Sequence, residues 1–144
     1  MATFTKVNDF VEALAEKKHN LGADTLTIAL SNTAPASEAS NPTADGNGVL
    51  ANVTQISYTN CSARAITTSA SAQTSGTYKL TLTDLVLTAS GGTVGAFRYI
   101  YIYNDTATND ELVGLYDYGS SITLQDGDTF TIDFDGTNGV LTIA

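Results

Sequence analysis

The side chains that most often carry enzyme chemistry are scarce in this sequence of 144 residues, which has one histidine, His19, and one cysteine, Cys61. Nucleophilic catalysis needs a base beside a serine, threonine or cysteine, and a zinc site of the usual kind needs several histidine or cysteine ligands. Neither set can be assembled, and no glycine-rich phosphate-binding motif is present. We therefore expect no enzyme activity, no cofactor and no metal ion.

His19 and Cys61 each have a structural interpretation. His19 follows Lys17 and Lys18 near the expected end of a helix, where cations interact favourably with the helix dipole. Cys61 is expected to be a small, partly buried side chain between strands, and a single cysteine cannot form a disulfide within the chain.

Two further chemistries could use the carboxylates of the C-terminal third. Asp126 and Asp128, separated by one glycine, and the pair Asp133 and Asp135 could face one side and hold Ca²⁺. Asp117, Asp126, Asp128 and Asp133 are also candidate acids for glycoside cleavage, although no carboxyl is singled out as one with a raised pKa. The ligand order of an EF-hand is absent, and hairpin turns also require Asp and Gly. We therefore expect these aspartates to be ordinary residues of turns and of the solvent-exposed surface.

The sequence FRYIYIYND, residues 97–105, alternates aromatic residues with Arg98, Ile100 and Ile102. Both sides of such a strand are apolar or aromatic, so each face needs a cover. The N-terminal helix, a long loop or another subunit could supply it, and tyrosine suits a subunit contact because it buries area and keeps a hydroxyl. The candidate interface residues are this aromatic row and two tyrosines of the next strand: Phe97, Tyr99, Tyr101, Tyr103, Tyr116 and Tyr118.

The elements that would position these side chains begin with a helix in the N-terminal segment, residues 1–22. Asn8 or Asp9 can cap this helix, and Asp9 with Glu12 has the spacing of a capping box. An alternating pattern at residues 25–30 then predicts a half-buried strand. Residues 31–48 contain both prolines and predict one long exposed loop.

The chain beyond Arg64 consists of short strand patterns separated by turns. A change of parity between Leu82 and Leu85 predicts a bulge, a bend or a crossing between sheets at Thr83 and Asp84. About eight strands at regular spacing, with no crossover helices between them, favour an antiparallel β-sandwich or jelly roll with one short N-terminal helix. The length fits a single domain over residues 1–144.

The charge is strongly acidic, with a formal net charge of −9 and a pI near 4.1. No Lys or Arg follows Arg98, whereas eight carboxylates do. This field disfavours nucleic-acid binding; it can serve solubility and repulsion between copies, or match a basic partner. The sequence has neither an apolar run of about 18 residues nor a signal-peptide pattern, so we expect no membrane partner and synthesis in a cytosol.

The order of several motifs resembles small virion proteins of tailed bacteriophages over almost the whole chain. The motifs are the short initial helix, LTIALSNTAP at 26–35, FRYIYIYND at 97–105, DYG at 117–119 and FTIDFDGTNGVL at 130–141. The resemblance implies a capsid decoration (cement) protein on the virion surface, bound to the major capsid protein as a trimer or other small oligomer. It fixes no binding residues. The alternatives are a tail-fibre or baseplate module that binds a host receptor or glycan through residues 31–48, and a carbohydrate-binding module.

Overall fold

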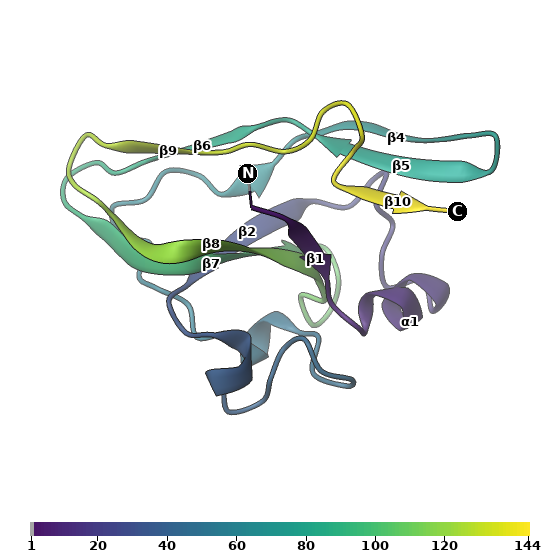
Figure 1. The fold of residues 1–144 in the computed structure, drawn as a ribbon, viewed down its shortest axis with the longest axis horizontal. Coiled ribbons are helices and arrows are strands. Elements are labelled where there is room, and N and C mark those ends of the chain that lie inside the picture. The colour runs from purple at the N-terminus through teal and green to yellow at the C-terminus, as the bar shows by residue number, and fades with distance from the viewer. Residues whose placement is uncertain (1) are drawn as a thin grey trace.

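The computed structural model describes residues 2–144, which form antiparallel sheets and one short helix (Figure 1). The expected mainly β fold is confirmed, and its arrangement is consistent with a β-sandwich. In chain order the elements are β1 (Phe4–Lys6), α1 (Phe10–Ala15), β2 (Leu26–Ser31), the 3-10 turns Pro35–Ser37 and Leu50–Asn52, β3 (Ala65–Ile66), β4 (Thr68–Thr74), β5 (Thr77–Leu82), β6 (Leu85–Thr88), β7 (Val94–Asn104), β8 (Leu112–Leu124), β9 (Thr129–Ile132) and β10 (Leu141–Ile143).

Two layers of strands face each other. The first is a five-stranded sheet in the order β1-β8-β7-β2-β3, and the second combines β10-β5-β4 with the pair β6-β9. Only Thr83 and Asp84 separate β5 from β6, and both strands pair antiparallel with the chain segment that contains β9 and β10. The predicted interruption at Thr83 and Asp84 is therefore confirmed. There the Asp84 carboxylate accepts a hydrogen bond from the Phe134 amide at 2.9 Å.

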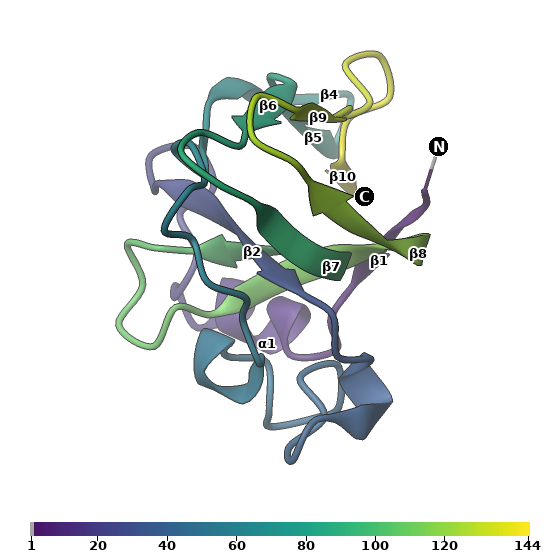
Figure 2. The ribbon, with the colours of Figure 1, turned by 90° about the vertical axis from the view of Figure 1, so that its left-hand side faces the viewer.

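Most of the segment between β2 and β3 packs on the side of the five-stranded sheet opposite the second layer (Figure 2). Its last part reaches the second layer, where Ser62 N–H bonds to the Thr88 carbonyl of β6 at 3.0 Å. The segment includes both 3-10 turns, and its backbone bonds to the sheet include Ile56 N–H to the Leu30 carbonyl at 3.0 Å and Leu112 N–H to the Gly48 carbonyl at 2.8 Å. The expected exposed loop is thus wrong in one respect. Residues 31–48 belong to a segment that folds back onto the body, and Ser31, Pro42 and Gly48 are buried.

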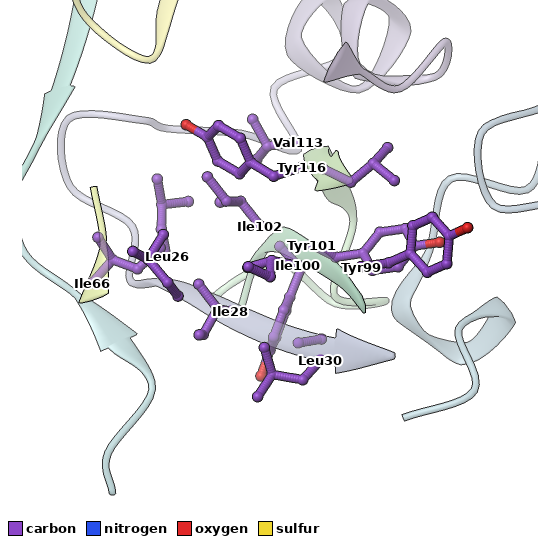
Figure 3. Close-up of a cluster of buried hydrophobic side chains, with 14 of the residues drawn as sticks. Leu26, Ile28, Leu30, Ile66, Tyr99, Ile100, Tyr101, Ile102, Val113 and Tyr116 are labelled. Carbon is purple, nitrogen blue, oxygen red and sulfur yellow. The ribbon is translucent and has the colours of Figure 1, made fainter. Parts of the chain in front are cut away.

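The core between the two sheets centres on β2 and β7, where Ile28 lies opposite Ile102 and Leu30 opposite Ile100. These side chains are almost completely buried and form one cluster with neighbours on β3 and β8 (Figure 3). All six residues of β2 are buried. The expected half-buried strand is therefore wrong, because β2 is covered on both faces.

The N-terminal helix is much shorter than the pattern predicted, since α1 ends at Ala15. Lys17, two residues further on, has a positive φ of 63° and turns the chain away. The capping box also fails to form: Asp9 is the N-cap but makes no side-chain capping bond. Its carboxylate instead accepts hydrogen bonds from the amides of Gly46 and Gly48, both at 2.8 Å, and so holds the long segment against the helix.

Candidate functional site

The tyrosines of β7 do not form an exposed row. Tyr99, Tyr101 and Tyr103 are buried beneath the segment between β2 and β3. Burial raises the pKa of Tyr101, and the nearby charge of Glu38, a residue of that segment, raises it further. The structure therefore favours an internal cover for this face. The expectation of an aromatic row open to a partner is corrected for these three residues.

Phe97 lies on the other face of β7. The pairing of β7 with β8 is irregular on both sides of Phe97, which changes the alternation between Gly95 and Tyr99. As a result the Phe97 ring contacts the Phe130 ring of β9, with centroids 5.5 Å apart in an edge-on arrangement. The predicted single row of four aromatic side chains is wrong because a register irregularity is invisible in a perfectly alternating sequence.

The two tyrosines of β8 have different environments. Tyr116 is buried, whereas Tyr118 is 50% exposed and is one of three large apolar or aromatic side chains exposed among residues 2–144. The Tyr118 ring packs edge-on against Phe130 at 5.4 Å. Of the six predicted interface residues, Tyr118 is thus the one that a partner can reach extensively; the other five are buried within the chain.

A groove of about 270 Å³ opens beside Tyr118. Its walls come from β8 and β9, with Ile100 of β7 between them, and its lining is largely apolar: Ala2, Ile100, Tyr116, Tyr118, Phe130, Thr131, Ile132 and Asp133. Phe130 and Ile132 are not among the residues that the sequence predicted for a site. Their alternation predicted an apolar face of a strand but could not show that this face lies at an opening.

The groove lies at the β8 and β9 side of the sandwich. On the opposite side, β3 is separated from β4 by one residue, so the chain itself joins the two layers. On the groove side, β8 passes into β9 through residues 125–128, which also join the two layers, and β1 pairs with β8 only at residues 114–116. Within residues 2–144, β9 pairs with β6 alone and β8 beyond Tyr116 pairs with β7 alone.

The charge around the groove is negative. Arg98, the last cation in the sequence, binds Asp117 through two hydrogen bonds of 2.6 and 2.8 Å, and this contact lowers the pKa of the Asp117 carboxyl. Asp133 lines the groove and has no ion-pair partner within residues 2–144. Burial, followed by the charges of Asp133 and Asp135, raises the pKa of Tyr116. The field of these carboxylates therefore reaches the groove wall.

The other aspartates that could support chemistry have roles in turns. Asp126 accepts a hydrogen bond from Gly91 N–H at 2.8 Å, and Asp128 accepts one from Gln125 N–H at 2.9 Å. Asp135 accepts bonds from the amides of Thr137 and Asn138 at 2.9 and 2.7 Å. In the part of the chain that the structure describes, no group of three or more His, Cys, Asp or Glu side chains is arranged to hold a metal ion.

His19 and Cys61 are parts of the packing. His19 stacks on Phe10 with ring centroids 5.2 Å apart, and its Nδ1 lies 3.2 Å from the Asn104 amide nitrogen. It follows the end of α1 by several residues, so the expected helix-dipole interaction is replaced by burial, which lowers the pKa of His19. Cys61 is partly buried, and burial raises the pKa of its thiol.

Comparison with known proteins gives no assignment: no family model, no curated protein and no solved structure matches the chain. No helix within residues 2–144 is long and apolar enough to cross a membrane. The interpretation of the groove therefore depends on its own residues and on the sequence resemblance described above.

Proposed function

We propose that this protein is a structural component of a tailed-phage virion, a capsid decoration (cement) protein that binds the outer capsid surface and stabilises the shell. The observation that carries the proposal is the largely apolar groove between β8 and β9, lined by Tyr118 and Phe130. Contiguous apolar surface on a soluble protein is typical of an interaction site. The sequence resemblance to small phage virion proteins suggests that such a site would bind to a phage particle.

The proposed mechanism is mechanical. Each copy bridges neighbouring subunits of the major capsid protein, and a small homo-oligomer, with a trimer favoured, multiplies the contacts. Because linked contacts raise the effective concentration of one another, several weak contacts give a tight attachment. Binding to the assembled shell alone stabilises that state by mass action. Synthesis in the host cytoplasm and attachment at the virion surface complete the proposal.

Labelling of purified virions tests this function. Virions of the phage that encodes the protein would be incubated with antibody against the full chain and examined by negative-stain electron microscopy. We expect label over the heads, together with a loss of heat resistance in particles assembled without the protein. Unlabelled virions, or heads equally stable without the protein, would overturn the proposal.

The second candidate is a tail-fibre or baseplate module that binds a host receptor or glycan. The half-exposed Tyr118 and the adjacent Phe130 favour it, because aromatic rings in an open groove can stack on a sugar. The same labelled virions separate the two functions, since antibody on tails and bare heads would support the second. A glycan array with the purified protein would then identify the sugar class.

A further inference from the structure

The two strands that wall the groove both present backbone that no other strand bonds. Among residues 2–144, β9 hydrogen-bonds along one edge only, to β6, and β8 loses its outer neighbour β1 after Tyr116. Proteins usually shield such edges because unpaired N–H and C=O groups recruit further strands. Proline and lysine, two common shielding residues, are absent from both β9 and the stretch 117–124. The edges are therefore open to an extended segment.

The side chains next to these edges are of the kind that a strand would bury. Phe130 and Ile132 alternate along β9 and face the groove, while Tyr116 and Tyr118 alternate along β8 on the opposite wall. Added strands gain affinity from backbone hydrogen bonds, and specificity from pockets that accept every second side chain. A free sugar would find few polar groups here besides the two tyrosine hydroxyls, since Thr131 and Asp133 are the other polar residues that line the groove.

The negative charge of the groove indicates what kind of segment would bind in it. Asp133 is in the groove, Asp135 is close enough to influence Tyr116, and no Lys or Arg follows Arg98, whose guanidinium already binds Asp117. A second copy would bring the same acidic surface against this one, which is unfavourable. A segment with Lys or Arg beside its apolar residues would instead be attracted.

We propose that the groove between β8 and β9 binds an extended basic segment of a partner protein, which adds a strand to the outer edge of β9 and places apolar side chains against Tyr118 and Phe130. The inference rests on the proposed function for the source of the segment, an arm or loop of the capsid shell. It adds the site, the backbone pairing and the charge of the partner.

Peptide binding to the full chain tests the inference directly. The probe is a fluorescein-labelled peptide of nine residues that alternates Val and Lys, and fluorescence polarisation follows its binding. Replacing Lys with Glu should weaken binding at least tenfold because the groove is acidic, and methylating every second amide nitrogen should do so by removing backbone donors. Equal binding of the three peptides, or no binding of the Lys peptide, would overturn the inference.

Matched variants locate the site. Tyr118→Ser should weaken binding of the Lys peptide about tenfold, a typical loss for an aromatic anchor. Val86→Ser is the control, because Val86 is also 50% exposed but does not line the groove. Asp133→Asn should weaken binding by about two- to fivefold and reduce its salt dependence. Asp105→Asn, an exposed acid outside the groove lining, should leave binding unchanged.

The same variants on purified virions separate this inference from the proposed function. If the wild-type protein binds heads and Tyr118→Ser binds them as well as Val86→Ser does, the groove is not the docking site. The cement function is then unaffected. Wild-type protein that binds the Lys peptide but not virions would overturn the cement function and the assigned source of the segment. An oligomer that Tyr118→Ser dissociates and Val86→Ser does not, seen by light scattering, would show a second copy in the groove and overturn the inference.

Discussion

The tyrosines of β7 and the tyrosines of β8 have the same chemistry and opposite accessibility. Tyr101 is completely buried beneath a segment of its own chain, whereas Tyr118 is 50% exposed at the groove. An aromatic strand therefore does not by itself mark an interface. What marks one is an aromatic side chain that the rest of the chain leaves uncovered, here because the pairing of β1 with β8 ends at Tyr116 and β9 does not pair with β8.

The largest expected effect comes from truncating the covered row. Tyr101→Ala should lower the free energy of unfolding by about 3–5 kcal/mol, because it leaves a cavity in a closed core. Urea denaturation followed by circular dichroism measures the change. Tyr101→Phe is the control: the Tyr101 hydroxyl is buried without a hydrogen-bond partner within residues 2–144, so its removal should be neutral or stabilising. A loss below about 1 kcal/mol for Tyr101→Ala would show that the cover is loose.

A smaller effect should follow from releasing the cover itself. Asp9→Ala removes the acceptor of the Gly46 and Gly48 amides and should cost about 1–2 kcal/mol, since bonds to a charged acceptor are stronger than neutral ones. Hydrogen exchange at these two amides should accelerate.

Asp45→Ala is the matched control for that release, because Asp45 accepts a single exposed bond from Asn8. It should stay within about 0.5 kcal/mol of the wild type. Equal losses for the two variants would contradict the role given to Asp9.

Acid should destabilise the chain first through His19. The pKa of His19 is lowered from its ordinary 6.5, chiefly by burial; Lys18 acts in the same direction, and Glu111 and Asp24 oppose it. The unfolded chain therefore binds more protons than the folded chain. The contribution of His19 to the free energy of unfolding is fully present above about pH 6.5 and is lost as the pH falls below that value. Unfolding free energies measured between pH 5 and 8 should decline toward pH 5 in the wild type.

His19→Gln tests the assignment of that decline. This variant should flatten the pH dependence between pH 5 and 7, whatever its effect on overall stability. The lowered pKa values of Asp117 and Asp135 act in a more acidic range, since their ordinary value is 3.8. An unchanged slope in His19→Gln would assign the dependence to another group.

The smallest effect on stability should come from the groove. Tyr118→Ala should change the free energy of unfolding by no more than about 0.5 kcal/mol, as is usual for surface substitutions. Thermal denaturation beside Val86→Ala, which has the same exposure, provides the comparison. A loss of several kcal/mol would place Tyr118 in the core and remove the contrast between the two sets of tyrosines.

The sequence by itself determined the class of the fold and the position of its main interruption. Alternating apolar residues and turn residues recur through the chain, and their period depends only on local backbone geometry. For this reason the strands, the break at Thr83 and Asp84 and the apolar character of both faces of β7 could be read before the structure. The acidic C-terminal third was likewise a matter of composition.

Only the tertiary structure decided which faces are covered and by what. The folding of residues 31–48 onto the body, the shift that turns Phe97 away from Tyr99, and the bonding of Asp9 to Gly46 and Gly48 all join residues distant in sequence or depend on pairing between strands. The groove has the same origin, because its lining brings together residues of β7, β8 and β9. Local periodicity carries no information on such contacts, since burial is a property of the assembled layers and not of the strand.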